Sequence, residues 1–332
     1  MTDSTVEQPV PVKAPASAAG EAVVRAKPQV AVVALPAGAA DHRVEPGGDA
    51  DAGANPQARR IAMINQKGGV GKTTTTVNIG AALARMGHRV LLVDMDPQAH
   101  LTLHLGLHPE ELELSAYELM TDVTVTAGQV VRAVSDNLWV LPASVDLAGV
   151  EAELAPKMIT GQAQRILAKK LAIQDGAGAA TNARPFDHIF IDCPPSLGLL
   201  AINAMTLANE VIIPMQAHFL ALQGVSQLLE TVSLVRQSFN DQLRVSGIVL
   251  CMHEKQTLLA GEVLADIETF LREAHGTNLP WAGARVYQPA IRRNIKLAEC
   301  PSFGQTVFDY APDCRGAADY MNLAKSIAIP TP

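Results

Sequence analysis

Aromatic residues are scarce in this chain: Phe, Trp and Tyr together make up 4% of its 332 residues. The apolar fraction is nevertheless 48%, so a core must be built from the side chains of Ala, Val, Leu and Ile. Such side chains suit parallel strands covered by helices on both faces, because those strands are buried on both sides and read as aliphatic runs. A chain of this length can bury a substantial core in one large or two ordinary domains.

The chain also lacks an excess of positive charge. Its formal net charge is −7 at pH 7, from 26 Lys and Arg residues against 33 Asp and Glu residues. This balance excludes a protein coated in basic charge for binding nucleic acid. Any contact with DNA must therefore come from a local basic patch.

Cysteines with the spacing of a metal site or a redox pair are absent as well. Cys193, Cys251, Cys300 and Cys314 are far apart in the sequence and form no C-x-x-C pair. We expect them to be reduced, partly buried thiols of a cytosolic protein.

No stretch of the sequence reaches the roughly 18 consecutive apolar residues of a membrane-spanning helix. The apolar run at residues 30–35 is too short and too far from Met1 to be the core of a signal peptide, and Pro28 and Pro36 bracket it. The sequence therefore predicts a cytoplasmic protein that does not enter a membrane.

Residues 1–58 differ in composition from the rest of the chain. They are rich in Ala, Pro, Gly, Val and acidic residues, and contain neither an aromatic residue nor a sustained helical period. Such a segment buries too little apolar surface to offset the entropy lost on ordering, so we expect a disordered tail. The tail would serve either as a plain tether or as a docking segment for a partner. Residues 59–332 would form the folded domain.

Strands and helices alternate from residue 60 onward. Aliphatic runs predict strands at residues 60–64, 89–94, 138–141, 188–192, 211–214, 245–251 and 284–287. Helical patterns lie between them, at residues 73–86, 143–154, 159–173, 198–208, 222–239 and 258–274. The sequence therefore predicts an α/β fold, with a mostly parallel twisted sheet and helices on both of its faces. Ligands of such sheets bind beyond the carboxyl ends of the strands.

The turn after the first predicted strand carries the strongest functional signal. Residues 65–74 read Asn-Gln-Lys-Gly-Gly-Val-Gly-Lys-Thr-Thr and lie between a strand and a helix, as a phosphate-binding loop requires. Three glycines let the backbone N–H groups curl around an anion, and the helix adds its positive dipole end. Lys72 would reach the β- and γ-phosphates, and the hydroxyl of Thr73 would ligate Mg²⁺. The strict pattern has Gly where Gln66 stands, so this is a variant loop of the P-loop NTPase type.

Two further strand ends carry carboxylates where phosphate chemistry needs them. Asp192 ends the apolar run at residues 188–191 and would hold Mg²⁺ directly or through a water molecule. Asp94 and Asp96 end the second strand, and one of them could orient the attacking water. Alone, each would be interpreted as a turn or capping residue, but beside the phosphate loop they predict a Mg²⁺-dependent ATPase site.

Three motifs thus follow one another along the chain. They are residues 67–73 (Lys-Gly-Gly-Val-Gly-Lys-Thr), 94–98 (Asp-Met-Asp-Pro-Gln) and 192–196 (Asp-Cys-Pro-Pro-Ser). In this order they resemble the ParA family of partitioning ATPases, which has a deviant Walker A motif and counts the MinD-like proteins among its relatives. The similarity runs from about residue 60 to residue 328 and includes Arg293-Asn294 and residues 299–302.

The resemblance implies a role for each residue of the site. Lys67, the signature lysine of the family, would cross a dimer interface to the phosphates of the partner subunit, and Asp96 would position the hydrolytic water. Asn294 would lie near the adenine. The implied catalytic residues are Lys67, Lys72 and Asp96. ATP would be held by Lys67, Gly68, Gly69, Val70, Gly71, Lys72, Thr73, Thr74 and Asn294, and Mg²⁺ by Thr73 and Asp192.

The resemblance also implies a function in chromosome or plasmid segregation. ATP would close a homodimer that binds DNA without sequence preference at the nucleoid, and a ParB-like partner would stimulate its slow hydrolysis. The best candidate for the DNA patch is Arg292, Arg293 and Lys296, three basic residues in five positions, although such a cluster could also be a solvated loop. Two departures from the family pattern bear on these implied contacts. Arg292 stands where relatives commonly have a proline two residues before the asparagine, which bears on the adenine contact. Residues 254–257 (Glu-Lys-Gln-Thr) stand where many relatives place an arginine in the DNA-contacting region, which bears on the DNA contact.

Other functions fit parts of the pattern. A ParA-like ATPase could position a protein cargo, such as a chemoreceptor cluster or a microcompartment, because the partner selects the cargo. A membrane-cycling MinD-type regulator would need a basic amphipathic helix at the C-terminus, which residues 322–332, with one Lys and two Pro, do not offer. An electron carrier of the nitrogenase-reductase type would need cysteine ligands for an iron–sulfur cluster at a dimer interface, and Cys193 and the other cysteines do not suit that role.

Overall fold

The structure, a computed structural model, describes residues 58–175, 185–217, 221–254 and 258–329, so the tail predicted at residues 1–58 lies outside the described residues except for Ala58. The strands are β1 (Arg59–Met63), β2 (Val90–Asp94), β3 (Arg132–Ser135), β4 (Leu138–Leu141), β5 (His188–Asp192), β6 (Glu210–Met215), β7 (Arg244–Leu250) and β8 (Arg285–Tyr287). The α-helices are α1 (Lys72–Arg85), α2 (His100–His104), α3 (Ala116–Thr121), α4 (Ala127–Val130), α5 (Val150–Met158), α6 (Ile166–Asp175), α7 (Leu199–Leu207), α8 (Ala221–Ser238), α9 (Leu258–Ala274), α10 (Ile295–Glu299), α11 (Val307–Tyr310) and α12 (Arg315–Ala328). Short 3₁₀ helices are η1 (Pro109–Glu111), η2 (Val145–Gly149), η3 (Ala163–Arg165) and η4 (Cys300–Phe303).

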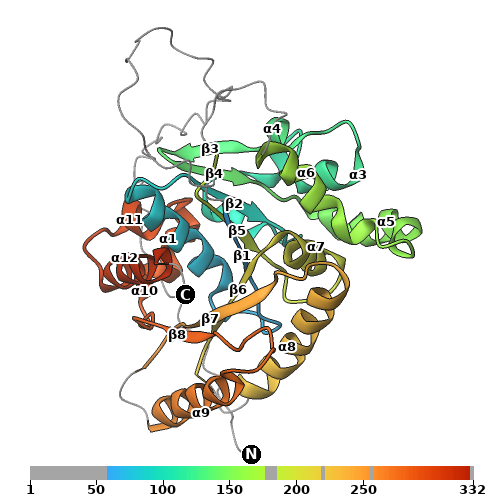
Figure 1. The fold of residues 1–332 in the computed structure, drawn as a ribbon. Helices are drawn as coiled ribbons and strands as arrows, with labels where there is room; N and C mark the ends of the chain where they lie inside the picture. Colours follow the sequence, from blue (N-terminus) through green and yellow to red (C-terminus); the bar gives the residue numbers. More distant parts are fainter. Residues whose placement is uncertain (1–57, 176–184, 218–220, 255–257, 330–332) are drawn as a thin grey trace, which may run out of the picture. The chain divides into compact units, whose positions relative to one another are not determined.

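The strands form one sheet in the order β3-β4-β2-β5-β1-β6-β7-β8. Every neighbouring pair is parallel except β3 and β4, which form an antiparallel hairpin at one edge. Figure 1 shows α1 and α10 to α12 on one side of this sheet, and α5 to α9 on the other. The predicted fold class, a mostly parallel sheet with helices on both faces, is confirmed.

All seven predicted strands are present with bounds within one residue of those expected. The hairpin strand β3 was missed because it is short, with no fully buried residue to give an aliphatic run. The helices predicted at residues 143–154 and 159–173 begin later than expected, after 3₁₀ turns. Gly161, with a φ of 72°, lies where the second of these helices was expected to start.

The central strands alternate their side chains between two separate cores. Leu91 and Val93 of β2 face the core formed with α3 to α9, whereas Val90 and Leu92 face the core that contains α1 and α12. Every residue of β2 and of β5 is buried. This two-sided burial is the reason why these strands read as aliphatic runs rather than as alternating patterns.

Helix α12 was not predicted, and it is the longest of the missed helices. Its apolar residues Tyr320, Leu323 and Ile327 are buried on the core side where α1 lies. The C-terminal segment is therefore part of the folded domain. No helix among the described residues has the length and apolar character needed to cross a membrane.

The carboxyl ends of β1, β2 and β5 meet at one edge of the sheet. Asp94 and Asp192 are directly paired in the register of β2 and β5, and Asp192 is also paired with Met63 at the end of β1. The loop between β1 and α1 starts immediately after Met63. The topology therefore brings the phosphate-loop motif and both aspartate motifs to the same place.

Gly247 is required where β7 and β8 pair. A Cβ at this position would overlap the carbonyl oxygen of Arg285 and lie 2.7 Å from Cε2 of Tyr287. We expect Gly247→Ala to lower the free energy of unfolding by about 1–3 kcal/mol, as overpacking does in other cores. Gly224→Ala in α8 is the matched control, because a Cβ there meets no atom within 4 Å and should be neutral or slightly stabilising. Equal melting temperatures for the two variants would contradict this account.

Candidate functional site

The phosphate loop is held in place by Asn65. Its Nδ2 donates to the carbonyl of Pro214 at 2.8 Å, and its Oδ1 accepts from the backbone N–H of Lys67 at 2.9 Å. Gly69 and Gly71 adopt left-handed backbone conformations, with φ of 71° and 93°. Gly71 is the N-cap of α1, so the loop passes directly into a buried helix whose N-terminal N–H groups face the loop.

The two lysines of the loop lie in opposite environments. Lys72 is buried, with 7% of its surface exposed, and its Nζ donates to the carbonyl of Lys67 at 3.3 Å. Burial lowers the pKa of Lys72, and the negative charges of Asp192 and, to a lesser extent, Asp96 act in the opposite direction. Lys67 itself is exposed. One lysine thus lies inside the loop and the other on its outer surface.

Thr73 and Asp192, the two predicted magnesium ligands, are in direct contact. The hydroxyl of Thr73 donates to Oδ2 of Asp192 at 2.6 Å, and that of Thr76 donates to Oδ1 at 3.2 Å. A hydroxyl and a carboxylate at this edge suit Mg²⁺, which commonly takes one or two protein oxygens and completes its shell with phosphate and water. Among the described residues there is no cluster of three or more His, Cys, Asp or Glu that could form a complete protein cage for a metal.

The aspartates of the second motif have different surroundings, which the sequence left open. Asp94 is fully buried; its Oδ2 accepts from the backbone N–H and the hydroxyl of Thr102, at 2.9 and 2.7 Å. Its Oδ1 accepts from the N–H of Asp96 at 3.1 Å. Asp96 is partly exposed and accepts through Oδ1 from the N–H of Gln98 at 3.0 Å. Asp94 therefore anchors the loop, while Asp96 is the one that can reach a water molecule.

A cavity of about 430 Å³ continues from the phosphate loop. Gly71 and Thr74 line it at the loop, and the rest of its wall is Cys251, Met252, residues 291–295, Leu297, Ala298 and Tyr320. Asn294 is part of this wall, and its place near the adenine stays a prediction. The Oδ1 of Asn294 accepts from the N–H of Lys296 at 2.9 Å and caps α10, so this side chain also fixes the start of that helix.

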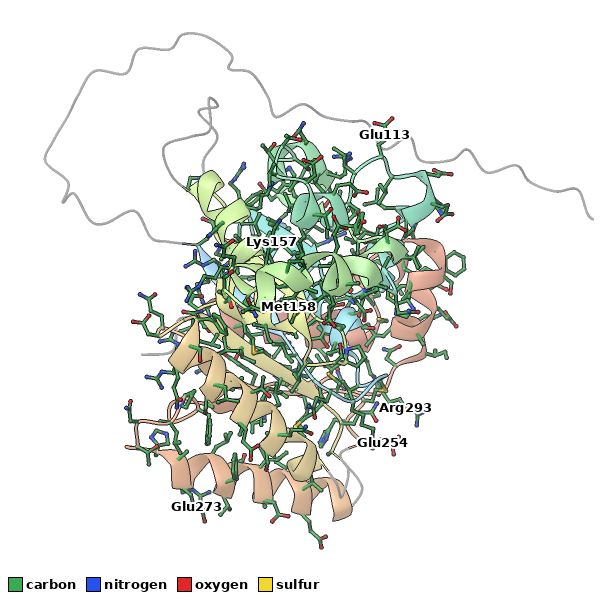
Figure 2. The ribbon with its side chains drawn as sticks, turned by 90° about the vertical axis from the view of Figure 1, so that its right-hand side faces the viewer. Glu113, Lys157, Met158, Glu254, Glu273 and Arg293 are labelled. Carbon is green, nitrogen blue, oxygen red and sulfur yellow. The ribbon has the colours of Figure 1, made fainter. Side chains whose placement is uncertain are left out.

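Two of the three candidate DNA-binding residues, Arg292 and Arg293, line this cavity, and Lys296 lies in α10. Each of the three is paired with a carboxylate. Arg292 pairs with Asp319 at 2.7 Å, Arg293 with Glu254 at 3.2 Å, and Lys296 with Glu299 at 2.9 Å. Figure 2 shows Arg293 and Glu254 beside each other at the surface. The patch is therefore locally balanced in charge, and its DNA-binding role stays a prediction.

Several residues of the site were not found from the sequence. Asn65 and Thr76 adjoin the loop motif, and their positions beside it could have suggested a supporting role. Asp319 and Tyr320 could not have been found, because more than 200 residues separate them from the loop and no motif marks them. Tyr320 nevertheless lies with its hydroxyl 3.1 Å from that of Thr75 in α1.

Sheet, loop and carboxylates together define an ATP-binding P-loop enzyme of the α/β class. A family model described as "AAA domain" matches residues 58–245. The chain is 41% identical over 268 residues to the sporulation initiation inhibitor protein Soj of Bacillus subtilis (strain 168), covering 81% of this chain and 97% of that protein. It is 38% identical over 274 residues to the chromosome partitioning protein ParA of Caulobacter vibrioides (strain NA1000 / CB15N), covering 82% and 95%. The chain belongs to the ParA/Soj family of partitioning ATPases.

Among solved structures, the fold is similar to that of cobyrinic acid a,c-diamide synthase from Mycobacterium smegmatis with a bound ATP analog and magnesium. The TM-score is 0.66 and the sequences are 36% identical, over 81% of this chain and 94% of that chain. This chain is therefore similar in fold and in sequence to a protein whose structure contains an ATP analog and magnesium.

The buried carboxylates predict how the stability of the ligand-free protein depends on pH. Burial, followed by the nearby charge of Asp94, raises the pKa of Asp192 from 3.8 to about 7. Between these two values the folded state holds a proton that the unfolded state releases, so this group lowers the free energy of unfolding as pH rises through that window. We expect the melting temperature to fall over this range and Asp192→Asn to reduce the fall. An unchanged pH profile in the variant would show that Asp192 does not titrate this way.

Asp96 and Asp94 should respond differently to removal. Asp96→Ala should still bind ATP but hydrolyse it about 10²–10⁴-fold more slowly, the usual cost of losing a positioned acid–base group. Asp94→Ala should instead lower the melting temperature, because it leaves the N–H and hydroxyl of Thr102 without their buried acceptor. Single-turnover hydrolysis and thermal melts on both variants separate the roles; normal hydrolysis by Asp96→Ala would transfer the role to Asp94.

Proposed function

We propose that this partitioning ATPase is a switch that dimerises with ATP, binds DNA without sequence preference in that state, and is reset when a ParB-like protein stimulates hydrolysis. The observation that carries the proposal is the contrast between Lys72 and Lys67 within one loop. Lys72 is buried and serves its own subunit, whereas Lys67 is exposed and available to a second molecule.

The loop is open on the side of Lys67. A Cβ placed on Gly68 or on Gly69 would meet no described atom within 4 Å. A second subunit can therefore approach the phosphates from this side, and its own Lys67 would add positive charge to the transferring phosphoryl group. Lysine acts at such a site as a point charge on a flexible stem, which suits a contact across an interface.

Within one subunit the remaining residues divide the phosphate chemistry. Lys72 and the N–H groups of the loop would neutralise the β- and γ-phosphates, and Thr73 with Asp192 would hold Mg²⁺. The metal supplies charge neutralisation at the phosphate oxygens. Asp96 would orient the water that attacks the γ-phosphate, and Asp94 would fix the loop that carries Asp96. The related Mycobacterium smegmatis structure, which contains an ATP analog and magnesium, supports the binding of nucleotide and Mg²⁺ in this fold.

DNA binding would depend on exposed ion pairs that can exchange partners. In the pair formed by Arg293 and Glu254, the side chains are 75% and 54% exposed, and in that of Lys296 and Glu299 they are 45% and 37% exposed. Exposed pairs contribute only about 0–1 kcal/mol, so a DNA phosphate can replace the glutamate at little cost. Dimerisation doubles the patch, which would explain how an acidic protein holds DNA only when ATP is bound.

Lys67 should be needed for dimerisation and not for binding of ATP by one subunit. We expect Lys67→Ala to bind ATP with near-normal affinity by calorimetry and to remain a monomer with ATP in light scattering. The variant compared with it is Asp96→Ala, which should accumulate as the ATP-bound dimer. An ordinary ATP-dependent dimer formed by Lys67→Ala would remove the basis for the trans role.

A salt titration on unrelated DNA duplexes tests the switch. The ATP-bound protein should bind all duplexes alike, and affinity should fall steeply with salt, by about 0.9 in log–log slope for each phosphate neutralised. Arg293→Glu combined with Lys296→Glu should abolish this binding while ATP-dependent dimerisation persists. Arg272→Glu with Lys325→Glu is the matched control, since it makes the same change in charge at exposed positions outside the patch.

Absence of DNA binding by the wild-type protein even at low salt would overturn the DNA-matrix part of the proposal. The ATPase assignment would survive that result, and the cargo would then be a protein assembly.

A further inference from the structure

Arg292 differs from the other two basic residues of the patch, because its partner is buried. Its Nε and Nη2 donate to Oδ2 and Oδ1 of Asp319 at 2.9 and 2.7 Å, and its backbone N–H donates to Oδ2 at 3.3 Å. The side chain of Asp319 is 8% exposed, whereas that of Arg292 is 46% exposed. This two-point contact fixes the plane of the guanidinium group as well as its position.

The pair is anchored to the helix that packs on the phosphate-loop helix. Asp319 lies in α12, and the next residue, Tyr320, places its hydroxyl 3.1 Å from that of Thr75 in α1. Neither Tyr320 nor Thr75 is exposed by more than 1%. The guanidinium group of Arg292 is thus fixed, through buried side chains, relative to the helix that begins at the phosphate loop.

Arg292 also lines the cavity that continues from the phosphate loop. The same cavity is lined by Gly71 at the loop and by the apolar or aromatic side chains of Ile291, Leu297 and Tyr320. An occupant bound by its phosphates at the loop would therefore carry its other end into a largely apolar space whose wall also holds the guanidinium groups of Arg292 and Arg293. Of these two groups, Arg292 is the one paired with a buried carboxylate, because Glu254, the partner of Arg293, is 54% exposed. The carboxylate of Asp319 uses the edge of the guanidinium group, which leaves the face free for a planar ring.

We propose that the base of ATP stacks on the guanidinium group of Arg292, whose plane is fixed by Asp319. Arg292 then belongs to the nucleotide pocket rather than to the DNA patch. The proposal rests on the proposed function in that it takes ATP as the occupant of the cavity. Arg292 touches the nucleotide in this assignment, and Asp319 is a positioning residue that acts through Arg292. Stacking depends on the flat face of the group, so charge alone would not replace it.

Calorimetry with ATP and with inorganic tripolyphosphate, both in Mg²⁺, separates the base from the phosphates. The wild-type protein should bind ATP more tightly than tripolyphosphate. Arg292→Ala should weaken ATP binding by about three- to thirtyfold, the range expected for a cation–ring contact, and leave tripolyphosphate binding unchanged. Arg292→Lys keeps the charge and a partner for Asp319 but loses the plane, so it should behave like Arg292→Ala. Asp319→Asn should give a smaller loss confined to ATP.

Arg315→Ala is the matched control, because Arg315 is exposed at the start of α12 and does not line the cavity. It should bind both ligands as the wild-type protein does. Thermal melts establish that each variant is folded.

Three results would overturn the assignment: wild-type ATP affinity in Arg292→Ala, full rescue by Arg292→Lys, or an equal loss of ATP and tripolyphosphate binding. If the wild-type protein bound neither ligand, the proposed function itself would fail and this assignment with it. If it bound tripolyphosphate as tightly as ATP, only the base pocket would be refuted.

Discussion

The hydrogen bond between Thr73 and Asp192 joins the two halves of the site. It connects the first turn of α1 to the end of β5, and Thr76 adds a second bond from the same helix to the same carboxylate. Because Asp192 is buried, its negative charge is unfavourable until a cation or a proton balances it, and its pKa is raised accordingly. Mg²⁺ bound beside Asp192 would supply that cation, and its binding would then relieve an electrostatic cost that the fold imposes.

Burial also distinguishes the two lysines of the phosphate loop and the two aspartates of the second motif. Lys72 belongs to a buried helix and Lys67 to an exposed turn, although they are only five positions apart in the sequence. Asp94 and Asp96 are divided in the same way, one saturated with hydrogen bonds in the interior and one at the edge of the solvent. In each motif one residue is buried and the other is exposed or partly exposed to solvent.

The last helix of the chain completes the site from the opposite end of the sequence. Helix α12 packs on α1, provides Asp319 as the partner of Arg292, and places Tyr320 beside Thr75. At its C-terminal end, Arg285 donates to the carbonyl of Ser326 at 3.1 Å, and Arg59 donates to that of Ile327. These contacts tie α12 to β1 and β8. The wall of the cavity beside the phosphate loop therefore depends on residues that carry no motif of their own.

The sequence by itself determined the α/β class, the seven aliphatic strands and the residues of the phosphate loop. It could do so because buried parallel strands are nearly continuous aliphatic runs and because a phosphate loop needs Gly, Lys and Thr at fixed spacing. Strand β3 was missed because it is a short edge strand, whereas α12 could have been predicted, since its buried residues Tyr320, Leu323 and Ile327 recur at helical spacing. Only the tertiary structure shows that Asp94 is buried and Asp96 is partly exposed, since both lie at the same strand end and differ only in how far the surrounding residues cover them. It also decided that Arg292 faces a cavity and a buried carboxylate, because Asp319 reaches it through a fold that no local spacing encodes.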